Sequence, residues 1–96
     1  KRLREEQEVF AADLVRARDA GVKSGSEEAE ALVERHRASI AQWYNVTPAR
    51  QLILARMYVG DPRFHEAYNG AQEYLLDLVT AHAAAEGVDV DNPQWG

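Results

Sequence analysis

The sequence contains no cysteine, and this absence excludes several kinds of chemistry at once. Disulfide bonds, thiolate nucleophiles and cysteine metal sites all need a residue that the chain lacks. No apolar run approaches the roughly 20 residues that span a bilayer, and the charged segment 1–8 does not resemble a signal peptide. We therefore expect a cytoplasmic protein. The first residue is not methionine, so we also expect the natural protein to extend further towards the N-terminus.

Basic residues are scarce as well, with 11 Lys and Arg against 16 Asp and Glu and a net charge of −5. Affinity for nucleic acids comes mostly from lysine and arginine displacing counterions from phosphates. If a protein of this charge acts on DNA, another segment of the protein has to contact the DNA. The length of 96 residues fits one domain, and 46% apolar with 28% charged residues is typical of a globular chain rather than a disordered one.

Helical periodicity runs through most of the chain. Apolar residues recur at steps of three and four, and the stretches are separated by glycines or by polar breaks. Ser26 and Thr47 are placed to cap helices, and Pro48 and Pro62 stand where a first helical residue is expected. The pattern predicts five helices over residues 1–20, 27–44, 48–59, 62–68 and 71–86, and no strand.

These helices predict an all-α fold, a five-helix bundle over residues 1–87 followed by an acidic irregular tail over residues 88–96. The third predicted helix is apolar on most sides, which is typical of a central helix. The tail ends near Trp95, and the sequence leaves open whether this side chain folds back onto the domain.

The residues that catalysis or metal binding would need are not arranged for either role. Two of the serines lie at a turn, where helix capping explains them, and Ser39 has no histidine one turn away. The three histidines are isolated along the chain, whereas a zinc site on a helix uses a spaced pair. We therefore predict no enzymatic activity, no catalytic residue, no metal ion and no cofactor.

His36 is the polar residue that stands out, because it falls on the apolar face of the second predicted helix, near Ile40 and Trp43. A backbone carbonyl or a carboxylate would satisfy such a histidine inside the core. Contact with a ligand is the functional alternative. Haem ligation is a third one, although no second feature of a haem pocket accompanies it.

The aromatic residues allow two interpretations. Tyrosine and tryptophan combine a flat apolar face with a polar tip, which suits heteroaromatic ligands but also suits the core of a small bundle. Core packing is the simpler interpretation for Phe64 and Tyr74. Trp43, Tyr44 and Tyr58 fit either interpretation, because they flank the break at residues 45–48, where a cleft could open.

The middle of the chain resembles the TipAS domain, the antibiotic-recognition region of MerR-type transcriptional activators. The resemblance rests on the pair His36-Arg37, the pair Trp43-Tyr44 and the segment LARMYVGDPRF at residues 54–64. It implies a globin-like helical fold that envelops a large, mostly apolar ligand, such as a thiopeptide or another multicyclic drug. Position by position, the candidate ligand-binding residues are His36, Trp43, Tyr44, Met57, Tyr58 and Phe64.

The same resemblance implies an effector-binding domain, since ligand binding in the family shifts an attached DNA-binding domain towards an activating state. Here DNA would be contacted only through a segment that this chain does not contain, no membrane is involved, and a homodimeric parent protein is compatible with the role. Members that capture thiopeptides covalently use a cysteine about where Ile53 stands, so we expect reversible, non-covalent recognition.

The chain departs from the family pattern at a second place, where the family's E-M-H reads Ala49-Arg50-Gln51. The polar lining of the cleft is therefore changed, and the ligand could differ with it. Two alternatives to the effector-binding domain stay open. One is a stand-alone domain that sequesters a drug, and the other is a helical protein-interaction module that binds no ligand.

Overall fold

The structure, a computed structural model, describes residues 2–42 and 45–95. In these two ranges the chain forms five helices and no strand: α1 (Arg2–Asp19), α2 (Glu27–Ala41), α3 (Pro48–Gly60), α4 (Arg63–Ala67) and α5 (Gln72–Ala85). The predicted all-α fold is confirmed, and the ends of the helices lie within a few residues of the predicted ones.

Local signals in the sequence explain where the helices begin and end. The Ser26 hydroxyl accepts a hydrogen bond from the Ala29 amide at 3.2 Å, and the Thr47 hydroxyl accepts one from the Arg50 amide at 3.2 Å. Each hydroxyl satisfies one of the amide groups that the first turn of a helix leaves free. Gly87, at φ 87°, lets the chain turn left-handed after α5, so that the Val88 amide donates to the Ala83 carbonyl at 2.9 Å.

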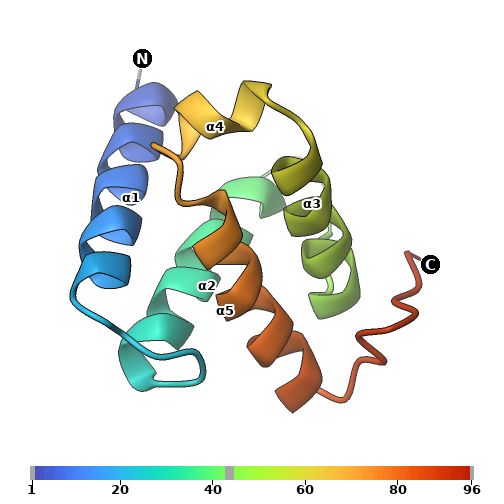
Figure 1. Cartoon of the computed structure of the whole chain (residues 1–96). Helices are drawn as coiled ribbons and strands as arrows, with labels where there is room; N and C mark the ends of the chain where they lie inside the picture. The colour runs from blue at the N-terminus through green and yellow to red at the C-terminus, as the bar shows by residue number, and fades with distance from the viewer. Residues whose placement is uncertain (1, 43–44, 96) are drawn as a thin grey trace.

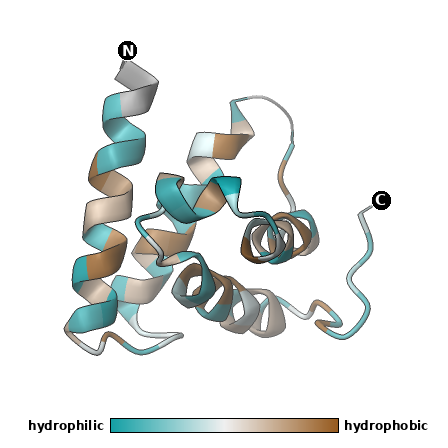
Figure 2. Ribbon diagram, turned by 45° about the horizontal axis from the view of Figure 1, so that its top comes forward, coloured by the Kyte–Doolittle hydropathy of each residue, from teal (hydrophilic) through white to brown (hydrophobic). Residues whose placement is uncertain are grey.

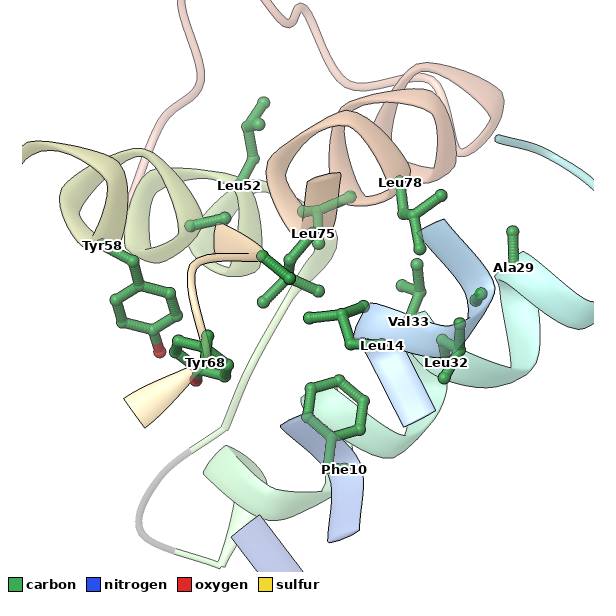
Figure 3. Packing of buried hydrophobic residues seen from close by; sticks show 14 of the residues in the cluster. Phe10, Leu14, Ala29, Leu32, Val33, Leu52, Tyr58, Tyr68, Leu75 and Leu78 are labelled. Carbon is green, nitrogen blue, oxygen red and sulfur yellow. The ribbon is translucent and has the colours of Figure 1, made fainter. Parts of the chain in front are cut away.

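The core lies where α1, α2, α3 and α5 meet, while the short α4 crosses one end of the bundle between α1 and α3 (Figure 1). Leu14, Leu52, Leu75 and Leu78 are each 0% exposed and come from three different helices. Figure 3 shows Leu14 between Phe10 and the leucines of α5. Burial of a leucine side chain contributes roughly 1.5–3 kcal/mol, so this contact region holds the helices together.

The third helix is not surrounded by the rest of the bundle, so the prediction of a central helix is wrong. Its buried face consists of Gln51, Leu52, Ala55 and Tyr58. On its other side Met57 is 50% exposed and Val59 is 37% exposed. Hydrophobic residues therefore reach the surface on this side of α3. Figure 2 shows how hydrophobic (brown) and hydrophilic (teal) segments alternate along the helices.

The tail runs beside α3 instead of leaving the domain (Figure 1). Val88 and Val90 are partly buried and pack against the core. The Arg56 guanidinium donates to the Val90 carbonyl, and Nε of Arg50 donates to the Trp95 carbonyl at 2.7 Å. Trp95 thus folds back onto α3, which answers a question that the sequence left open.

Candidate functional site

Five aromatic side chains meet between α1, α2, α3 and α4. We call this set the aromatic cluster; it consists of Phe10, His36, Tyr58, Phe64 and Tyr68. Phe10 belongs to α1, His36 to α2, Tyr58 to α3 and Phe64 to α4, and Tyr68 follows α4 directly. The cluster therefore exists only in the folded bundle, because its rings come from four separate parts of the chain.

Tyr58 makes the three closest ring contacts in the aromatic cluster. Its ring centroid is 4.5 Å from that of Phe64, 5.3 Å from that of Tyr68 and 5.6 Å from that of His36, whose ring it meets at 90°. These separations lie in the range of favourable aromatic pairs. Figure 3 shows Tyr58 and Tyr68 side by side. Burial raises the pKa of the Tyr68 phenol, while hydrogen bonds with the side chains of Tyr58 and Gln7 lower it.

One ring of the cluster, His36, pairs with the buried side-chain amide of Gln51. Nε2 of Gln51 is 2.8 Å from Nδ1 of His36 and donates to the Val33 carbonyl at 3.0 Å. Gln51 is 0% exposed and His36 is 1% exposed. Burial lowers the pKa of His36 from 6.5 to about 4, so the imidazole is neutral near pH 7.

The interior around the aromatic cluster carries no formal charge. Among the described residues the buried polar side chains are His36, Gln51 and Gln72, none of which is charged near neutral pH. The guanidinium of Arg35 lies over Phe10 with Cζ 5.3 Å from the ring centroid, and it pairs with Asp13 at 2.9 Å on the surface. Such an environment favours an apolar or neutral polar molecule over an ion, because an unpaired ion would lose its hydration.

The structure brings together three of the six residues predicted to bind ligand. His36, Tyr58 and Phe64 all belong to the aromatic cluster. Met57 does not, because its position on α3 turns it towards solvent, where it is half exposed. The remaining two, Trp43 and Tyr44, lie outside the described residues.

The hydrogen-bond partner of His36 differs from both partners that the sequence suggested for a core histidine. It is a glutamine amide, neither a backbone carbonyl nor a carboxylate. Sequence reasoning did not select Gln51, Phe10 or Tyr68 for the site. Phe10 lay on an apolar stripe, which could have marked it, but no local pattern places these three residues against His36.

An open surface depression lies elsewhere, with a volume of about 710 Å³. It is lined by the turn after α1 and the start of α2, namely Gly21, Val22, Lys23, Ser26, Glu27, Glu28 and Ala31. It shares no residue with the aromatic cluster. Its charged residues, Lys23, Glu27 and Glu28, are exposed to solvent, unlike the buried rings of the aromatic cluster.

The described residues contain neither a metal-binding group of side chains nor a helix that could span a membrane. No three histidine or acidic side chains in residues 2–42 and 45–95 are grouped to hold a metal ion. None of the helices in the same ranges combines the length and the apolar character that a membrane span requires.

Comparison with known proteins gives one family match. The model of the TipAS antibiotic-recognition domain matches residues 1–82, which includes all of the aromatic cluster and ends within α5. The match agrees with the globin-like helical fold that the sequence resemblance implies. Searches among curated proteins and among solved structures find no match.

Proposed function

Because the chain belongs to the TipAS family of antibiotic-recognition domains, we propose that it is the effector-binding domain of a MerR-type transcriptional regulator. The ligand is a large, mostly apolar small molecule, such as a thiopeptide or another multicyclic drug. Recognition is reversible, and the chain performs no catalysis.

The observation that carries the proposal is the aromatic cluster, which includes an uncharged His36 and lies inside the segment that the family model matches. Tyrosine and phenylalanine rings offer wide flat surfaces, and a few polar groups among them orient a ligand. The contribution of rings from several helices also supports a sensor role. A molecule that binds among them favours one arrangement of the helices over another, which is how binding is coupled to a distant domain.

Binding is non-covalent in this proposal. The family's covalent capture of thiopeptides needs a cysteine, and the chain has none. Because the chain has a net charge of −5, we propose that another segment of the parent protein contacts DNA. We also propose that the parent protein is cytoplasmic and dimeric.

Titration of the chain with a panel of thiopeptides and other hydrophobic drugs tests the proposal, with intrinsic tryptophan fluorescence as the readout. The chain has two tryptophans, so a Trp95→Phe variant assigns the signal to Trp43. Thermal unfolding provides a second readout, since a ligand at about 100 times its Kd stabilises the domain by about 2.7 kcal/mol. Saturable binding of at least one drug with a rise in Tm is the expected result.

A flat response across the whole panel would contradict the sensor role. Sedimentation of the same samples then tests the alternative of a helical interaction module, because a module of that kind would self-associate or bind a partner chain without any drug. A drug that binds without altering DNA binding by the parent regulator would instead indicate a sequestering domain.

A further inference from the structure

The orientation of the Gln51 side-chain amide follows from its two neighbours. The amide group lies 3.0 Å from the Val33 carbonyl oxygen and 2.8 Å from Nδ1 of His36. A carbonyl oxygen only accepts hydrogen bonds, so the group that faces Val33 has to be the NH₂ rather than the oxygen of the amide. This fixes Nε2 of Gln51 between Val33 and His36.

The tautomer of His36 follows in turn. The Gln51 NH₂ has two protons, and it donates one to the Val33 carbonyl and the other to Nδ1 of His36. Nδ1 must then accept, which places the single proton of the neutral ring on Nε2. The titratable groups that face this ring are the phenols of Tyr58 on α3 and Tyr68 after α4, while Phe10 on α1 offers only an apolar ring.

The protonated nitrogen of His36 has no hydrogen-bond partner among the described residues. The same is true of Oε1 of Gln51. Both side chains are more than nine-tenths buried. Buried polar atoms are nearly always paired in folded proteins, so an unpaired donor next to a cluster of aromatic rings indicates that a ligand supplies the missing acceptor.

We infer that Gln51 is a positioning residue that holds His36 as a neutral Nε2–H donor, and that the site therefore takes a ligand with an uncharged acceptor, such as an amide carbonyl or an azole nitrogen. This inference rests on the proposed function, because it assigns the ligand to the same aromatic cluster. A cationic group offers no acceptor to His36. An anion would lose its hydration among uncharged side chains.

The tautomer can be measured without any ligand, by ¹⁵N NMR of the three histidine side chains. From about pH 5 to about pH 8, Nδ1 of His36 should resonate as an unprotonated nitrogen and Nε2 as a protonated one. His82 is an internal reference of the opposite kind, because its Nδ1 lies 2.8 Å from a carboxylate oxygen of Glu30 and donates to it. A protonated Nδ1 in neutral His36 would overturn the inference.

Variants at position 51 show whether glutamine causes this tautomer. Gln51→Glu keeps the shape but replaces the NH₂ donor with a carboxylate, so Nδ1 of His36 should become protonated. Gln51→Met removes the donor without adding charge, so both tautomers of His36 should be populated in this variant. It also provides the test if the glutamate variant does not fold. The matched control is Gln72→Met, another buried glutamine, which lies near His65 and should leave His36 unchanged. A His36 tautomer that survives both substitutions at position 51 would overturn the positioning role.

Three small probes with the same ring test the ligand class: benzamide, benzamidine and benzoate. Benzamide should shift the Nε2 resonance of His36 and bind at least about tenfold more tightly than protonated benzamidine or benzoate. The preference should disappear in Gln51→Met and persist in Gln72→Met. Equal binding of the three probes, or no binding by any of them, would overturn the inference about ligand class. The drug titration reports separately on the proposed function, which stands if a drug binds while benzamide is not preferred.

Discussion

The guanidinium of Arg50 lies over the indole ring of Trp95, with 5.3 Å between Cζ and the ring centroid. The same side chain donates from Nε to the Trp95 carbonyl at 2.7 Å and from Nη1 to the Asn45 carbonyl at 2.7 Å. One arginine therefore links the tail to the connection between α2 and α3. Arg50 and Asn45 lie inside the segment that the family model matches, whereas Trp95 lies beyond it, so this link joins the matched domain to the tail.

Replacing Arg50 with glutamine should release the end of the tail. Both carbonyl contacts and the cation–π contact are lost, and the partly exposed setting limits the cost to about 1 kcal/mol. Amide hydrogen exchange should become faster in residues 91–95 and stay unchanged in α1, because the packing of Val88 and Val90 and the Arg56 contact still hold the start of the tail. Arg37→Gln is the matched control, since Arg37 pairs only with Glu34 on its own helix among the recorded ion pairs. Equal protection of the tail in both variants would show that Arg50 does not hold it.

Leu14→Ala should cost about 2–5 kcal/mol of the free energy of unfolding, because it leaves a cavity in the core between α1 and α5. Val9→Ala on the same helix is the control, with a side chain that is 56% exposed. It should change stability by less than about 0.5 kcal/mol. Urea unfolding followed by far-UV circular dichroism measures both. Similar losses in the two variants would contradict the arrangement of α1.

Thr47→Ala should destabilise the domain by about 1 kcal/mol, because the amide of Arg50 loses its hydrogen bond at the start of α3. Thr80→Ala is a control inside a helix, where the hydroxyl donates back to the Leu76 carbonyl at 2.7 Å. That bond adds little to a helix, so the control should be near neutral. Thermal unfolding distinguishes the two, and a cap variant as stable as the parent would argue against the observed start of α3.

The stability of the domain should fall in mild acid because of His36. Its pKa is about 4 when folded and 6.5 when exposed, so below pH 6.5 the unfolded chain binds a proton that the folded domain does not. The contribution is fully present above pH 6.5 and is lost as pH falls towards about 4. The difference between the pKa values corresponds to about 3 kcal/mol.

His36→Gln should flatten this pH dependence over the same interval, as urea unfolding at a series of pH values would show. His65→Gln, at an exposed position, is the matched control and should keep the slope of the parent chain. A slope that is equal in parent and His36→Gln would mean that the buried histidine does not account for the loss in acid.

Trp43→Ala should weaken drug binding more than it lowers stability. The sequence motivates this prediction, because Trp43 belongs to the family pattern and flanks the break before α3. A tryptophan that forms part of the core would instead cost about 3–5 kcal/mol of folding free energy. Isothermal titration with a bound drug and urea unfolding of the same variant separate the two roles.

Most of the helical architecture could be predicted from the sequence. Apolar residues at steps of three and four mark the buried faces, and Phe10, Leu14 and Ala17 on α1 are indeed buried. The caps at Ser26 and Thr47 mark helix starts that the structure confirms. These signals are local, since each depends on residues within a turn or two along the chain. The apolar character of α3 misled the prediction, because a helix on the outside of a small bundle can expose Met57 and Val59.

The helices, their caps, the absence of cysteine chemistry and the family resemblance can all be read from the sequence, because they depend on neighbouring residues or on residue type. The packing of the helices, by contrast, places Gln51 against His36 and adds Phe10 and Tyr68 to the aromatic cluster. The tertiary structure also folds Trp95 back onto Arg50. Contacts of this kind depend on how whole helices pack, and the spacing of residues along the chain does not record which helix faces meet.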